Sequence, residues 1–92
     1  MIDYRVIGFL LSRKTMEMLG VLYKEDGKVY ASKLAKLTDT TYSHVVRSLK
    51  KLQKLNLIKT VPIGRINMIK LTEKGKKIAE ICHRLLTEIK NL

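Results

Sequence analysis

The chain has 92 residues, of which 46% are hydrophobic, and this length supports one small domain with a modest core and excludes a large enzyme with an enclosed catalytic cavity. Its 19 Lys and Arg residues outnumber its 8 Asp and Glu residues, for a formal net charge of +11. Such a charge attracts polyanions, so nucleic acid is the first candidate partner, ahead of an anionic membrane surface and an acidic protein. Residues 1–46 hold seven bases and five acids, whereas residues 47–92 hold twelve bases and three acids.

The inventory of reactive residues argues against catalysis and metal binding. A single cysteine, Cys82, and two histidines far apart in the sequence, His44 and His83, make neither an internal disulfide nor a zinc site. No nucleophile and base pair, phosphate loop or pair of carboxylates in an apolar setting is visible. The longest apolar run, residues 6–11, is far shorter than the roughly 20 residues of a membrane span. We therefore expect no enzyme, cofactor, metal or membrane partner, and a cytoplasmic, nucleoid-associated protein.

Capping residues and apolar spacing predict the helices in the first half of the chain. Ser12 can cap a helix over 13–25, which Asp26-Gly27 ends. A short extended segment at 28–31 then precedes a two-turn helix over 33–37, with Ser32 as its N-cap. After a polar turn, spacing of three and four residues over 41–55 predicts an amphipathic helix. Its packing face would carry Tyr42, Val46, Leu49 and Leu52.

The second half predicts a hairpin and a long helix. Residues 57–61 and 66–71 are rich in β-branched side chains and flank the turn 62–65, which contains Pro62 and Gly64. Thr72 can cap a last helix over 73–91. The apolar residues of this helix follow the 4,3 spacing of a coiled-coil seam, which consists of Ile78, Cys82, Leu85, Ile89 and Leu92.

This order of elements, together with two sequence stretches, carries a resemblance to a known family. Residues 31–58, which include Thr41-Tyr-Ser-His-Val-Val-Arg47, resemble the helix-turn-helix of MarR-like and related archaeal winged-helix transcription regulators. The run Ile69-Lys-Leu-Thr-Glu-Lys-Gly75 resembles the junction that follows their wing. The resemblance covers roughly residues 12–80. It implies an α+β, mostly α, winged helix-turn-helix with a three-helix core, a two- to three-stranded β-wing and a long C-terminal helix.

The same resemblance implies how the chain is organised. Residues 1–92 form a single DNA-binding domain, in which 12–72 are the helix-turn-helix and wing. MarR proteins usually carry longer chains, with additional helices at both ends that form the dimer and a ligand crevice. This chain lacks them, which makes a small-molecule effector doubtful.

Candidate DNA contacts lie on the polar face of helix 41–55 and on the wing. The N-terminal half of a recognition helix enters the major groove, where Arg47 is the best candidate for reading a base because a guanidinium binds guanine bidentately. Gly64 and Arg65, within wing residues 61–67, resemble a wing tip that enters the minor groove. A merely solvated charged face is the alternative. The full set of candidates is Ser32, Lys33, Thr40, Thr41, Ser43, His44, Arg47, Lys50, Lys51, Lys54, Gly64, Arg65 and Asn67.

The seam of the last helix can be covered within one protomer, by helix 13–25, or by a second copy across a two-fold axis. The additional apolar residues in 1–11 favour the homodimer, with 1–11 and 73–92 as dimerisation elements. Cys82 fits a small buried hydrophobe better than a redox switch. The expected interface residues are Phe9, Leu10, Ile78, Cys82, Leu85, Ile89 and Leu92.

Two other functions share these features. A sequence-blind DNA-coating protein would need the charge but not the polar residues Thr41, Ser43 and His44. A winged-helix protein-interaction module would place acids or exposed apolar residues on the recognition helix, whereas no acid lies between Thr40 and Glu73. The sequence therefore favours a homodimeric, sequence-specific regulator of transcription that binds double-stranded DNA.

Overall fold

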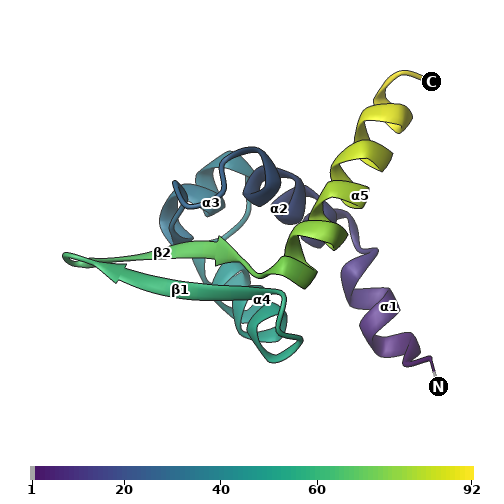
Figure 1. Ribbon diagram of the computed structural model, residues 1–92. Coiled ribbons are helices and arrows are strands. Elements are labelled where there is room, and N and C mark those ends of the chain that lie inside the picture. The colour runs from purple at the N-terminus through teal and green to yellow at the C-terminus, as the bar shows by residue number, and fades with distance from the viewer. Residues whose placement is uncertain (1) are drawn as a thin grey trace.

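The computed structural model describes residues 2–92, which form five helices and one antiparallel hairpin (Figure 1). The hairpin pairs its two strands in register from Ile58 with Leu71 to Ile63 with Ile66 and is a two-stranded sheet, to which an isolated bridge joins Val29 at Ile69. This is the predicted α+β winged-helix arrangement. The elements are α1 (Tyr4–Leu10), α2 (Arg13–Lys24), α3 (Ala31–Leu37), α4 (Tyr42–Lys54), β1 (Ile58–Ile63), β2 (Ile66–Leu71) and α5 (Glu73–Lys90).

The core lies where α2, α3 and α4 meet the inner ends of the two strands. The predicted amphipathic helices supply most of it, because their apolar residues recur every three or four positions and so share one face. Removing these side chains from water is the main stabilisation of the fold. The largest fully buried apolar side chains are Met18, Leu19, Leu22, Val29, Leu34, Val45, Leu52, Ile58 and Ile69.

Gly75 joins the start of α5 to the segment between α4 and β1. Thr72 caps α5 by accepting a hydrogen bond from the amide of Gly75, and its hydroxyl donates to the carbonyl of Asn56. The amide of Thr72 donates to the carbonyl of Leu57. A Cβ atom on Gly75 would collide with that same carbonyl group. The Leu71-Thr-Glu-Lys-Gly75 motif is therefore a backbone-to-backbone contact that only glycine allows.

The turn between α3 and α4 is fixed by side-chain hydrogen bonds. Asp39 adopts a positive φ of 50°, and the ammonium of Lys14 on α2 donates to the carbonyls of Thr38 and Asp39. The hydroxyl of Thr38 donates to the carbonyl of Leu34. These bonds satisfy the carbonyls at the end of α3 and hold α4 at a set angle to α2.

Two expectations about helix starts are wrong. The second helix of the helix-turn-helix begins at Ala31, with Tyr30 as its N-cap, so Ser32 lies inside the first turn and is not the cap. The bridge between Val29 and Ile69 ends the extended segment early, which lets the helix start two residues sooner. Ser12 does precede α2, but its side chain makes no capping hydrogen bond.

The sequence pattern predicts no element within residues 1–11, but the structure has the short helix α1 there. Asp3 caps α1 by accepting a hydrogen bond from the amide of Arg5. The helix has no fully buried residue, and it projects with the C-terminal half of α5 on the side of the molecule away from the hairpin (Figure 1). None of the helices within residues 2–92 is long and apolar enough to cross a membrane.

Candidate nucleic-acid interface

Helix α4 turns a polar and basic face to the outside. Thr41 caps it, because its hydroxyl oxygen accepts a hydrogen bond from the amide of His44. Val45, Ser48 and Leu52 are its buried residues, so the packing face is rotated by about one position from the predicted one. Tyr42, expected to pack inward, is instead 59% exposed. Five of the predicted contact residues of α4 are exposed, namely Ser43, Arg47, Lys50, Lys51 and Lys54, and His44 is half-buried.

Three of the predicted DNA-binding side chains are engaged within the protein. The hydroxyl of Thr40 donates to the carbonyl of Thr38 and lies 2.9 Å from the Thr38 hydroxyl, so it stabilises the turn before α4. The ammonium of Lys33 donates to the carbonyl of Lys28 at 3.4 Å. The ammonium of Lys51 lies 5.2 Å from the ring centroid of Phe9 on α1, a cation–π distance. Lys51 thus links α1 to the recognition helix.

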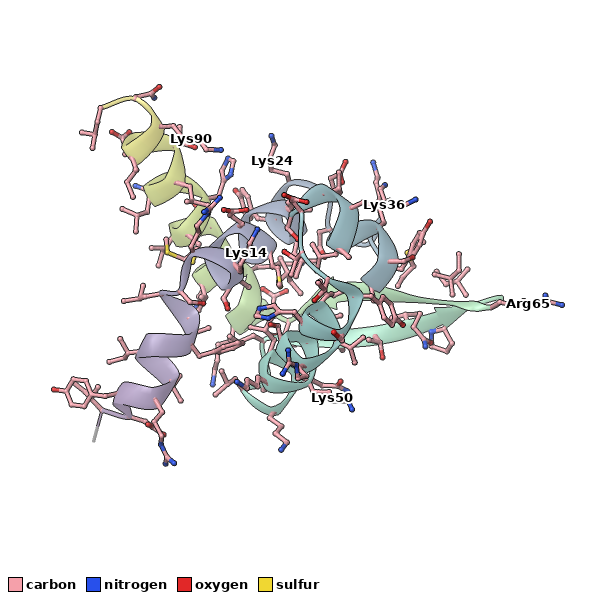
Figure 2. The ribbon with its side chains drawn as sticks, turned by 180° about the vertical axis from the view of Figure 1, so that it is seen from behind. Lys14, Lys24, Lys36, Lys50, Arg65 and Lys90 are labelled. Atoms are coloured by element: carbon pink, nitrogen blue, oxygen red, sulfur yellow. The ribbon has the colours of Figure 1, made fainter. Side chains whose placement is uncertain are left out.

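The wing ends in a tight turn with a single cation at its tip. Gly64 adopts a positive φ of 62°, which glycine accepts without strain in a two-residue hairpin turn. Arg65 follows it, is exposed and stands at the far end of the hairpin (Figure 2). The cross-strand pair Ile63 and Ile66 beside the turn is also exposed. The tip therefore offers one guanidinium between two apolar side chains.

A hollow of about 280 Å³ separates the wing from the helix-turn-helix. It brings together three residues that the sequence assigns to DNA contacts, Ser32 of α3, Arg65 of the hairpin turn and Asn67 of β2. Tyr30 and Tyr42 line it as well, and sequence analysis missed both. A signal for Tyr42 was its position at the start of α4, outside the row of buried residues on that helix. The hollow offers hydroxyl, amide and guanidinium groups beside the recognition helix.

The predicted dimer residues divide into two groups. Cys82 is buried within the protomer and Ile78 is half-buried, so the first half of the seam faces α2 of the same chain. Burial raises the pKa of the Cys82 thiol, which keeps it protonated and weakly nucleophilic. Phe9 and Leu10 of α1 are partly buried against the core. Leu85, Ile89 and Leu92 are exposed.

The described residues contain no group of three or more His, Cys, Asp or Glu side chains that could hold a metal ion. Figure 2 shows Lys50 on α4 and Lys24 at the end of α2 pointing to opposite sides. The two lysines thus belong to different faces, and only Lys50 shares the polar face of α4.

The helices together with the antiparallel hairpin define a winged-helix protein, in which α4 is basic and contains no acid. Residues 11–75 match the family model described as a winged helix DNA-binding domain. The chain therefore belongs to the winged helix DNA-binding domain family, whose members are DNA-binding transcription regulators and not enzymes.

Individual relatives agree with this assignment. The chain is 28% identical over 88 residues to an uncharacterized protein of Archaeoglobus fulgidus, covering 92% of this chain and 93% of that one. The crystal structure of AF1382 from Archaeoglobus fulgidus superposes with a TM-score of 0.76 at 28% identity, over 94% of this chain and 99% of that chain. MepR, a transcription regulator of the Staphylococcus aureus multidrug efflux pump MepA, matches with a TM-score of 0.75 at 26% identity, over 97% of this chain and 67% of that chain.

Proposed function

We propose that this chain is a homodimeric transcription regulator that binds double-stranded DNA at a specific sequence. Residues 41–55 would enter the major groove and wing residues 61–67 the adjacent minor groove. The observation that carries the proposal is the exposed face of α4, which combines polar and basic side chains with no acid between Thr40 and Glu73. MepR, a solved structure of similar fold, is itself a transcription regulator.

Within this proposal, Arg47 reads the sequence. It is exposed near the middle of α4, and a guanidinium can donate two parallel hydrogen bonds to guanine O6 and N7. Ser43, His44 and the free hydroxyl proton of Thr41 supply shorter-range contacts at the entering end of the helix. Lys50 and Lys54 act as point charges on the phosphates that flank the groove.

The wing would add a second contact. Arg65 is the only cation at the hairpin tip, and a narrow minor groove over A·T base pairs concentrates the negative potential that attracts such a side chain. Gly64 allows the tight turn that brings it forward. Asn67, Ser32 and Lys33 are suited to contact phosphates between the two grooves.

The dimer is supported by apolar surface that one protomer leaves uncovered. On α5, Leu85 is 43% and Ile89 50% exposed, and Leu92 follows in the same seam. We propose that these residues pack on the partner across a two-fold axis, with Phe9 and Leu10 of α1 beside them. Ile78 and Cys82 pack against the core of their own protomer and hold α5 in place. Two recognition helices would then face half-sites about one helical turn apart.

Binding of the full-length chain to a labelled duplex tests this proposal. Arg47→Ala should weaken binding to a preferred duplex by about tenfold or more, since a bidentate contact to guanine is worth about 1 to 3 kcal/mol. Lys24→Ala removes the same charge from the opposite side of the molecule (Figure 2) and should leave binding unchanged. Equal losses in the two variants would mean that only overall charge matters.

The other functions predict different results. A DNA-coating protein would bind all duplexes with similar affinity, and a protein-interaction module would bind none at moderate salt. A protein that regulates transcription acts where the chromosome is, so we place it at the nucleoid, in the cytoplasm. We propose no small-molecule effector.

A further inference from the structure

A second hollow lies on the other side of the recognition helix. It has a volume of about 210 Å³ and separates the junction of α1 and α2 from the middle of α4. We call it the Ser48 pocket. Two cations, an imidazole and three hydroxyl groups line it, with no acid among them, and these side chains belong to Ser12, Thr15, His44, Arg47, Ser48 and Lys51.

Ser48 is the unusual member of this set. The residue is only 4% exposed, yet among residues 2–92 its hydroxyl makes no hydrogen bond. The hydroxyl of a serine inside a helix commonly bonds to the carbonyl four residues earlier, as the Thr87 hydroxyl does to His83. The Ser48 oxygen is still reached by solvent, since no fully buried side-chain oxygen among the described residues lacks a partner. Because Ser48 lines the pocket, its hydroxyl is available to a group that enters there.

The start of α2 adds a positive potential to the same pocket. Ser12 occupies the N-cap position, but its hydroxyl donates to the carbonyl of Phe9 at 2.8 Å, lies 2.9 Å from the hydroxyl of Thr15 and does not cap the helix. The first turn of α2 contains no acidic residue. Uncapped amides and the helix dipole both favour an anion at this end.

The chemistry of the pocket suits a phosphate group. Phosphate oxygens accept hydrogen bonds from hydroxyl groups and attract Arg and Lys side chains. When a helix occupies the major groove, a sugar-phosphate backbone runs along each side of it. The hollow beside the wing lies on one side of α4 and the Ser48 pocket on the other, so the two can contact the two strands.

We propose that the Ser48 pocket binds one phosphate of the DNA backbone, and that this contact sets how α4 is seated in the groove. The proposal rests on the DNA-binding function proposed above. Ser48 donates the hydrogen bond, Ser12 lies beside it, and Lys51 supplies the charge, while Arg47 borders the pocket and is left to contact the base. The contact carries no sequence information itself but positions the residues that do.

The experiment combines a protein variant with single neutral linkages in the DNA. Ser48→Ala removes a hydroxyl that makes no hydrogen bond among the described residues and that lines the pocket, so the variant should fold and melt close to the wild type. Thr87→Ala, on α5, removes a hydroxyl far from α4 and is the control. Each protein is titrated with a preferred duplex and with duplexes in which one phosphate at a time is replaced by an uncharged methylphosphonate.

We expect Ser48→Ala to weaken binding about tenfold, as for loss of a hydrogen bond to a charged group, and Ser12→Ala to act in the same direction. At one phosphate position, the methylphosphonate should weaken binding by the wild type and by Thr87→Ala. The Ser48→Ala variant, whose affinity is already lower, should bind the duplex with that methylphosphonate as well as it binds the unmodified duplex. Such non-additivity identifies a direct pair.

Other outcomes would overturn the proposal. If the wild type binds a preferred duplex but no phosphate position couples to Ser48, the pocket does not bind DNA while the proposed function stands. A second result would also overturn the proposal. If inorganic phosphate shifts the NMR amide resonances of the pocket residues, but no phosphate position of the duplex couples to Ser48, the pocket binds a free anion and not the DNA backbone. If the wild type binds no duplex, the proposed function fails and this inference fails with it.

Discussion

At Gly75 the fold leaves no room for a side chain, because the backbone of Leu57 packs directly on its Cα atom. Gly75→Ala should therefore force the start of α5 away from β1 and cost about 1 to 3 kcal/mol or more. In a domain of this size such a loss lowers the Tm by at least about 5 °C.

The control for this prediction lies in α1. A Cβ atom on Gly8 would meet nothing within 4 Å, so Gly8→Ala should leave the Tm unchanged or raise it, since alanine favours a helix by about 0.5 to 1 kcal/mol. Calorimetry or thermal circular dichroism measures both variants. Equal Tm values for wild type and Gly75→Ala would show that the backbone of Leu57 does not pack closely on residue 75.

Cys82 gives a prediction that depends on pH. Burial raises the pKa of its thiol, so in the folded protein less of the reactive thiolate is present at neutral pH than in the unfolded chain. Alkylation by iodoacetamide should be slow near neutrality and accelerate as the pH rises, and denaturant should abolish the protection. Because unfolding frees a more acidic thiol, stability should also fall as the pH rises above the pKa of the unfolded chain. Rapid alkylation of the folded protein at neutral pH would instead favour the redox switch.

At the scale of elements, sequence periodicity predicted α2, α4, the hairpin and α5 to within a few residues. Each of these elements buries one face, so its apolar residues recur with the period of the helix or strand and can be recognised in the sequence. The segment that forms α1 is almost uniformly apolar, and no residue of α1 is fully buried, so no period marked it as a helix. The start of α3 was misplaced because a bridge between Val29 and Ile69, distant in sequence, fixes it.

The candidate site could be predicted only in part. Exposed positions such as Arg47 and Lys50 follow from the helical period and charge. The exposure of Tyr42 and the burial of Ser48 depend on how α4 is rotated against α3 and β1, which the pattern left uncertain by one position. Both hollows are formed by several elements that meet only in the folded chain, so no spacing in the sequence reveals them.

The C-terminal half of α5 carries the prediction about assembly. Leu85→Glu places a charge in the proposed seam on a side chain that is already exposed in the protomer, so the variant should fold but elute and sediment as a monomer. Thr87→Glu adds the same charge to the same helix outside the seam and should remain a dimer. A wild type that sediments as a monomer at micromolar concentration would contradict the proposed dimer.

For the whole molecule, the arrangement separates two tasks. Helix α4 carries the recognition face and Arg65 stands at the tip of the hairpin, whereas α1 and the C-terminal half of α5 project on the side away from the hairpin (Figures 1 and 2). Charge alone, at +11, would bring such a protein to any DNA. Only the groups on α4 and the wing can make it prefer one sequence, so sequence preference is the central claim.

Selection from a pool of random duplexes, run at two salt concentrations with wild type and Arg47→Ala, tests that claim most directly. The wild type should enrich a pseudo-palindrome with half-sites about one helical turn apart, and Arg47→Ala should bind it more weakly and lose the preference at one position of each half-site. The slope of log K against log salt, about 0.9 per neutralised phosphate, should stay large for both proteins. Uniform recovery of all sequences by the wild type would contradict the account and make this a protein that coats DNA without reading it.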